Sequence, residues 1–168
     1  MTGHWLMRCL WSVRHAAAMS SPRLARGRHS LPNACYEITT MAWQRRLLFV
    51  DARTAKAVID ELGRRQDRGD VLTHAWTLMP DHLHWLFELR APSLSGCLQR
   101  FKSLSALAVH RSSHTTGRVW QPGYYDHRLR SEEDLASQAS YIVANPIRKG
   151  LVSAPGDYPY AWCRWDIG

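Results

Sequence analysis

Two histidines that are one residue apart, His82 and His84, lie in an otherwise apolar run. In a β-strand successive side chains point to opposite faces, so both imidazoles would share one face of a sheet. The other face would carry Leu83, Trp85 and Phe87, which are apolar enough to require burial. Two adjacent imidazoles can begin a divalent-metal site, and an ordinary polar strand face is the alternative interpretation.

A tyrosine and an asparagine four residues apart form a second candidate group. Tyr141 and Asn145 would be neighbours on the surface of a helix that ends before Pro146. The acidic residues after Ser131 suit the positive end of that helix. The helix can pack on a sheet and present both side chains at the border of its apolar stripe, which consists of Leu135, Ala139, Ile142 and Val143. Simple packing of the tyrosine and an Asn-Pro helix stop are the alternatives.

The hydrophobic periodicity predicts the elements that would position these residues. Strands are expected at residues 34–40, 71–79, 82–90 and 125–129, and helices at residues 51–68, 93–111 and 131–145. The order β-α-β-β-α-β predicts an α+β fold of the ferredoxin-like, RRM-like type, in which helices cover one face of an antiparallel sheet. The other face would be free and would carry the two histidines, and a C-terminal helix would follow. Residues 21–168 are expected to form a single domain after a disordered extension at residues 1–20.

The chain of 168 residues carries a formal net charge of +8, and this charge is unevenly distributed. Residues 1–30 contain five arginines and no acid, and residues 98–130 contain six basic residues and one acid. Clustered positive charge indicates nucleic acid as the first candidate partner, and solubility is the alternative. The four cysteines show no C-x-x-C spacing, which argues against a zinc finger or a disulfide scaffold. Reduced thiols and a cytoplasmic location are expected, and no apolar run is long enough to span a membrane.

Three segments taken together resemble one family. They are Met-Pro-Asp-His-Leu-His at 79–84, Val-Trp-Gln-Pro-Gly-Tyr-Tyr-Asp-His-Arg-Leu-Arg at 119–130 and Tyr-Ile-Val-Ala-Asn-Pro-Ile-Arg-Lys-Gly-Leu-Val at 141–152. In this order they closely resemble the single-tyrosine HUH transposases. Within that group they look most like the transposases associated with repetitive extragenic palindromes (REP), which are domesticated relatives in bacterial chromosomes. The resemblance spans residues 23–162.

The resemblance implies a role for each motif residue. His82 and His84 match the pair that binds Mg²⁺ or Mn²⁺, and Asn145 takes the place of a polar third ligand. Tyr141 matches the nucleophile, which would attack a DNA phosphodiester, form a 5′-phosphotyrosine and release a 3′-hydroxyl, so that strands are rejoined without ATP. A free phenol has a pKa of about 10 and is a poor nucleophile at neutral pH, so a metal would have to activate the phosphate. His127 is a candidate general base and equally a candidate DNA contact.

The resemblance also implies the partner, a single-stranded DNA hairpin of the REP type with a short tetranucleotide beside its stem. The candidate contacts to the DNA backbone are Arg45, Arg46, Lys102, Arg128, Arg130, Arg148 and Lys149. Trp120, Tyr124 and Tyr125 are candidates to stack on unpaired bases, although Trp120 in Trp-Gln-Pro-Gly could equally belong to the core. Association with the bacterial nucleoid and a monomeric state are expected, with a dimer as the alternative.

A non-catalytic module that binds single-stranded nucleic acid on an RRM-like sheet is the alternative function. Such modules place aromatic side chains on their exposed strands. Here Leu86 and Glu88 follow the histidines on that face, which fits a base-stacking platform poorly. The residue pattern therefore favours a metal-dependent DNA nicking and joining enzyme.

Overall fold

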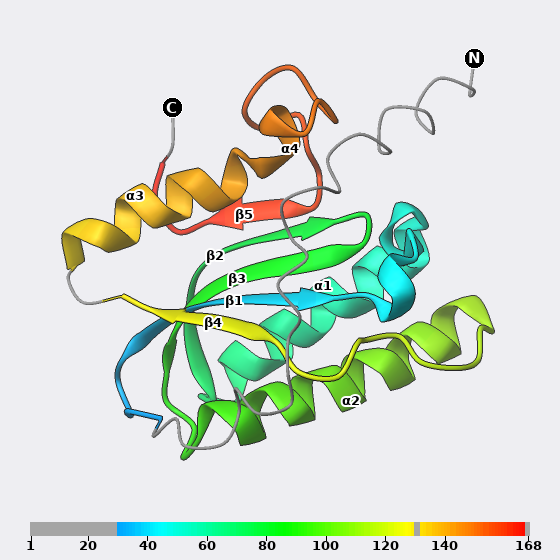
Figure 1. Ribbon diagram of the computed structural model, residues 1–168, viewed down its shortest axis with the longest axis horizontal. Coiled ribbons are helices and arrows are strands. Elements are labelled where there is room, and N and C mark those ends of the chain that lie inside the picture. Colours follow the sequence, from blue (N-terminus) through cyan, green and yellow to red (C-terminus); the bar gives the residue numbers. More distant parts are fainter. Residues whose placement is uncertain (1–29, 130–131, 167–168) are drawn as a thin grey trace.

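The computed structural model describes residues 30–129 and 132–166 of the chain (Figure 1). The disorder expected for residues 1–20 lies outside these ranges, as do Arg130 and the helix start expected at Ser131. The described residues form a five-stranded sheet with the strand order β4-β1-β3-β2-β5 and with helices on both faces. None of the helices in this part of the chain combines the length and the hydropathy needed to span a bilayer.

The strands and helices follow the predicted order. The strands are β1 (Cys35–Met41), β2 (Val71–Met79), β3 (His82–Leu89), β4 (Tyr125–Arg128) and β5 (Ala161–Cys163). The helices are α1 (Ala52–Asp67), α2 (Leu94–Ser113), α3 (Glu132–Val143) and α4 (Asn145–Arg148), with 3₁₀ turns η3 (Trp43–Arg45) and η4 (Leu48–Val50) after β1. All neighbouring strands are antiparallel, which confirms the predicted α+β fold. The edge strand β5 is not predicted by the pattern, because its three residues are too few to show alternation.

Local side-chain contacts explain where α1 and α2 begin. Asp51 accepts hydrogen bonds from the backbone N–H groups of Arg53 and Thr54. Ser93 likewise accepts a hydrogen bond from the backbone N–H of Gly96. These side chains satisfy N–H groups that have no partner within the first turn of a helix, so each fixes the residue at which its helix starts.

The main hydrophobic core lies between the sheet and helices α1 and α2. Trp85 and Phe87 of β3 are fully buried, with ring centroids 4.3 Å apart, and Phe101 of α2 lies 5.2 Å from Trp85. Trp85 also donates its indole N–H to the hydroxyl of Thr73. This burial confirms the prediction that the residues alternating with the two histidines face the helices.

The face that carries the histidines is not free, because α3 covers part of it (Figure 1). The sheet and α3 share a second core, which consists of Ala75, Leu86, Leu135, Ala139 and Ile142. Leu86 alternates onto this face and is fully buried there, and burial of a leucine contributes about 2 kcal/mol of stability. The prediction of an open face is therefore wrong over β2 and the adjoining part of β3, where apolar side chains require cover.

Candidate active site

His82 and His84 lie side by side on the face of β3 that α1 and α2 do not cover. Their ring centroids are 4.9 Å apart, and 12% and 17% of the two side chains are exposed. His84 is flanked across the sheet by Thr39 of β1 and Thr77 of β2. Because β3 is the central strand, its neighbours on both sides hold the imidazoles in place.

Both imidazoles are oriented through their Nδ1 atoms. The hydroxyl of Thr39 lies 2.9 Å from Nδ1 of His84, and the carboxylate of Asp81 lies 2.5 Å from Nδ1 of His82. With Nδ1 occupied, Nε2 is the atom of each ring that is left to ligate a metal. Burial, followed by the charges of His82 and Arg148, lowers the pKa of His84 to about 3, so this ring is neutral at physiological pH. A neutral imidazole is the form that binds metals.

The Thr39→Val variant is expected to weaken metal binding, because valine has nearly the shape of threonine but cannot bond to Nδ1 of His84. We expect the Kd for Mn²⁺, measured by electron paramagnetic resonance, to rise about tenfold. Thr40→Val is the matched control, since Thr40 is buried and its hydroxyl has no hydrogen-bond partner among the described residues. An equal rise in both variants would contradict the orienting role of Thr39.

Tyr141 is held near the histidine pair by the way in which α3 docks on the sheet. Thr77, the cross-strand partner of His84, donates its hydroxyl to the backbone carbonyl of Ile142 at 3.0 Å. This buried bond anchors the last turn of α3 beside the histidines, and Tyr141 is the residue before Ile142. Tyr141 is 55% exposed, so a substrate can reach it.

Arg148 of α4 connects the tyrosine with the other site residues. Its guanidinium carbon lies 3.6 Å from the centroid of the Tyr141 ring. One of its nitrogens donates to Oδ1 of Asn145 at 2.7 Å. Its positive charge also lowers the pKa of His84. Arg148 therefore contacts Tyr141 and Asn145 directly and acts on His84 through its charge.

Asn145 does not share a helix with Tyr141, contrary to the single helix predicted through residue 145. Helix α3 ends at Val143, and Asn145 begins α4, where it is 7% exposed. Its Oδ1 accepts the bond from Arg148, while its Nδ2 is buried without a partner in the described part of the chain. Two imidazoles and an amide are ligand types that a divalent metal accepts, so these residues fit the ion that the resemblance implies. A carbonyl oxygen has two lone pairs, so Oδ1 of Asn145 keeps one for a metal, although the positive charge of Arg148 on the same oxygen would weaken that bond.

Glu37 of β1 belongs to the site although the sequence analysis does not single it out. Its Oε1 lies 3.8 Å from Nδ1 of His84, and its Oε2 accepts a hydrogen bond from Gln138 of α3 at 2.7 Å. Burial raises the pKa of the Glu37 carboxyl, opposed by the charge of His127 and by the bond from Gln138. Glu37 therefore ties α3 to β1 beside the histidines. Glu37 alternates with the apolar residues of β1, and this pattern could have identified it from the sequence as a residue of the histidine face.

The candidate DNA contacts on β4 divide between the two faces of the sheet. Tyr125 pairs with Thr39 and lies on the histidine face, as does His127 two residues later. Arg128 pairs with Tyr36, whose side chain is in the main core, so Arg128 belongs to the opposite face. The register of β4 therefore brings Tyr125 and His127, but not Arg128, to the face of the metal-ligand candidates.

Several of the other candidate cations lie close to the histidines. Arg45 donates to Asp81 at 3.0 Å, and the same carboxylate orients His82. Arg46 follows Arg45 and is exposed. Lys149 of the segment after α4 is also exposed, and its charge contributes to the lowered pKa of the His84 ring described above.

Trp120 is a core residue, so the prediction that it stacks on bases is wrong. It is 7% exposed and donates its indole N–H to the hydroxyl of Ser105 at 2.9 Å. Its neighbour Tyr124 is partly buried against the same core. The alternative that Trp120 belongs to the core is thereby confirmed.

Lys102 has a structural role besides its predicted contact with DNA, which stays a prediction. Its ammonium donates to the backbone carbonyls of Gln121 and Gly123, at 2.6 and 2.5 Å. Burial lowers the pKa of Lys102 to about 8. The ammonium therefore holds the loop that leads into β4.

Comparison with known proteins gives consistent matches. The family model described as "Transposase IS200 like" matches residues 30–145. A REP-associated tyrosine transposase from Escherichia coli (strain K12) is 26% identical over 94 residues, which are 56% of this chain and 55% of that relative. A solved REP-associated tyrosine transposase bound to a REP hairpin superposes with a TM-score of 0.64 at 22% identity, covering 85% of this chain and 82% of that chain. At this identity the structural likeness shows a shared fold, and the match to the curated relative spans about half of its length.

Proposed function

The chain belongs to the family of IS200-like transposases, and we propose that it is a metal-dependent enzyme that nicks and joins single-stranded DNA through a 5′-phosphotyrosine. The observation that supports the proposal is that the last turn of α3, which carries Tyr141, is anchored on the strand beside the two oriented imidazoles. Neutral imidazoles supply metal ligands, and an exposed tyrosine supplies a hydroxyl that can act as a nucleophile.

In the proposed reaction the phenolic oxygen of Tyr141 forms a bond to phosphorus, and the bond from phosphorus to the 3′-oxygen breaks. The phenolic proton passes to a base, and the leaving oxygen takes up a proton to become a 3′-hydroxyl. A divalent metal held by His82, His84 and Asn145 would neutralise the charge of the phosphate. The phosphotyrosine retains the energy of the broken bond, so another 3′-hydroxyl can reverse the step and join a strand.

The charges around the site favour the binding of a phosphate. Arg148 contacts both the Tyr141 ring and Oδ1 of Asn145, and a phosphate oxygen there would compete for its guanidinium. Such competition would draw the positive charge away from Oδ1 of Asn145 and so strengthen its bond to the metal. Binding of DNA and completion of the metal site would then be coupled through Arg148.

The proposed substrate is a single-stranded DNA hairpin of the REP type, and the solved relative is bound to a REP hairpin. The candidates to contact it are Tyr125 and His127 on the histidine face and Arg46 directly after η3. We expect the protein to act as a monomer on chromosomal DNA in the bacterial cytoplasm. The mass of the complex with a hairpin distinguishes this state from a dimer.

The alternative of a non-catalytic module with an RRM-like sheet is less well supported. Such a module needs an open sheet face on which bases can stack. Here α3 covers part of that face and buries Leu86. The remaining part carries two metal-ligand candidates where a stacking platform would carry aromatic side chains.

A hairpin oligonucleotide with different labels at its two ends tests the proposed function. With Mg²⁺ or Mn²⁺ the protein should become covalently attached to the 3′ label, because a 5′-phosphotyrosine retains the downstream fragment. The 5′ label should appear in a shorter fragment that a polymerase can extend, since that fragment ends in a 3′-hydroxyl. Attachment to the 5′ label would contradict the direction of attack, and binding without cleavage at any metal concentration would favour the non-catalytic alternative.

A further inference from the structure

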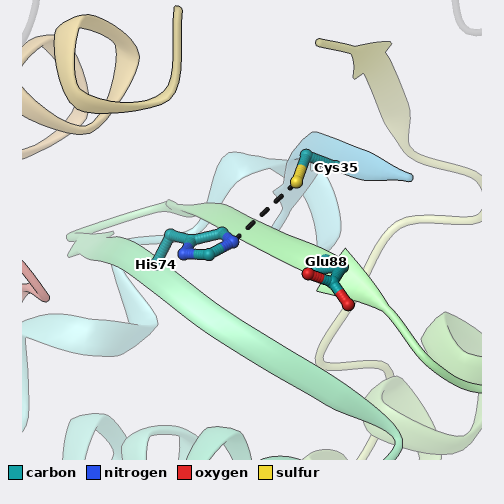
Figure 2. A group of neighbouring side chains, drawn as sticks. All are labelled: Cys35, His74 and Glu88. Atoms are coloured by element: carbon teal, nitrogen blue, oxygen red, sulfur yellow. Dashed lines mark hydrogen bonds between the residues drawn. The ribbon is translucent and has the colours of Figure 1, made fainter. Parts of the chain in front are cut away.

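A second group of metal-ligating side chains lies on the same face of the sheet, away from the histidine pair. Cys35 of β1, His74 of β2 and Glu88 of β3 gather around one space (Figure 2). One ligand atom of each lies within 4.8 Å of the other two. Glu88 is four residues beyond His84 on β3, which corresponds to about 13 Å in a strand. The group is therefore separate from the candidate active site.

Strand β2 is irregular at His74. The register between β2 and β3 shifts between Thr73 and Ala75, so His74 is the extra residue of a β-bulge. Thr73 faces the main core, where it accepts a hydrogen bond from Trp85, whereas Ala75 lies in the second core under α3. His74 follows Thr73 and faces α3 by ordinary alternation, and the bulge puts Ala75 on the same face, so two successive residues lie beneath α3.

His74 has the burial and the geometry of a metal ligand. It is 5% exposed, and its Nε2 lies 3.8 Å from Sγ of Cys35. Its Nδ1 is buried with no partner in the part of the chain that the structure describes. Burial, followed by the charge of Arg164, lowers the pKa of His74, which keeps the ring neutral. A thiolate and an imidazole that share a tetrahedral zinc are about 3.6 Å apart, so the observed separation is close to that of a filled site.

Glu88 supplies a second negative charge beside the cysteine. Cys35 and Glu88 are cross-strand partners, so their side chains leave the sheet next to each other. Oε1 of Glu88 accepts a hydrogen bond from Arg90 at 3.3 Å, which leaves Oε2 for a metal. A thiolate and a carboxylate together balance a divalent cation, so the nearby Arg90 and Arg164 do not exclude one. The three ligands line a cavity of about 610 Å³ next to Trp165, which has room for the ion and a water.

We propose that Cys35, His74 and Glu88 bind a zinc ion with water as the fourth ligand. Sulfur and imidazole donors favour zinc over magnesium, so this site would select a different metal from the imidazole and amide ligands around His84. The ion would connect β1, β2 and β3 at the end of the sheet under the first half of α3. The proposal does not depend on the DNA chemistry proposed above.

Cobalt(II) is the probe that distinguishes the two metal sites, because only this one contains sulfur. Titrated into the metal-free, reduced full chain, it should produce a sulfur-to-cobalt charge-transfer band that saturates at one equivalent and disappears when Zn²⁺ is added. Cys35→Ser should abolish the band, whereas the control variants Cys97→Ser, Cys163→Ser and His84→Ala should retain it. The absence of the band in the unmodified chain, or its survival in Cys35→Ser, would overturn the proposal.

A second variant separates loss of a ligand from loss of the fold. Glu88→Gln keeps the size and shape of the side chain but removes its charge. It should leave the melting temperature of the metal-free protein within the error of the unmodified chain while cobalt binds at least about tenfold more weakly. Unchanged affinity for cobalt in this variant would overturn the assignment of Glu88 as a ligand.

Discussion

The Tyr141→Phe variant is expected to form no covalent adduct with a labelled hairpin. Phenylalanine keeps the aromatic ring but lacks the hydroxyl oxygen that would become bonded to phosphorus. Removing the nucleophile of a covalent mechanism lowers the rate by about 10³-fold or more. Arg148 contacts the face of the ring, which the substitution preserves. The affinity for the hairpin should therefore stay close to that of the unmodified chain.

The Tyr125→Phe variant is the matched control for this experiment. Tyr125 lies on the histidine face and is 38% exposed, so it is also accessible to DNA. Its conversion to phenylalanine preserves stacking on bases and should leave adduct formation intact. Adduct at the unmodified level in Tyr141→Phe, measured on a denaturing gel, would exclude Tyr141 as the nucleophile. Loss of the adduct in Tyr125→Phe alone would identify Tyr125 of β4 as the nucleophile instead.

The His84→Ala variant is expected to lose the part of DNA cleavage that Mn²⁺ stimulates. His84 is the more central of the two imidazoles, held between Thr39 and Thr77 on the neighbouring strands. Without its Nε2 the metal retains one histidine and the amide of Asn145, which are too few ligands to hold it at the phosphate. We expect cleavage at a saturating hairpin concentration to fall by about 10²-fold or more. Removal of metal from the unmodified chain by a chelator should have the same effect.

The His114→Ala variant controls for the loss of any histidine. His114 is exposed at the C-terminal end of α2, away from the sheet face that carries the site. This variant should cleave at the unmodified rate and with the same dependence on Mn²⁺. The melting temperatures of the two metal-free variants show whether His84→Ala is folded. Both variants should still bind the hairpin. An unchanged Mn²⁺ dependence in folded His84→Ala would show that the histidine pair does not hold the metal.

Alternation along β3 was sufficient to place His82 and His84 on one face and Trp85 in the core. A strand repeats every two residues, so the relative facing of its side chains can be read without knowing its partners. The starts of α1 and α2 were predicted closely because Asp51 and Ser93 bond to backbone groups two or three residues away. Such short-range interactions are specified within a few positions of the sequence.

Only the tertiary structure decided what surrounds these residues. Thr39 and Glu37 reach His84 through the pairing of β1 with β3, and Arg148 of α4 reaches the ring of Tyr141 on α3. The bulge at His74 and the packing of α3 on the sheet likewise depend on contacts with elements that are distant in the sequence, which a local residue pattern does not identify. The sequence thus determined which side of its own element each residue occupies. Which other element covers that side depends on burying all apolar surfaces of the chain at once, and that is a property of the whole fold.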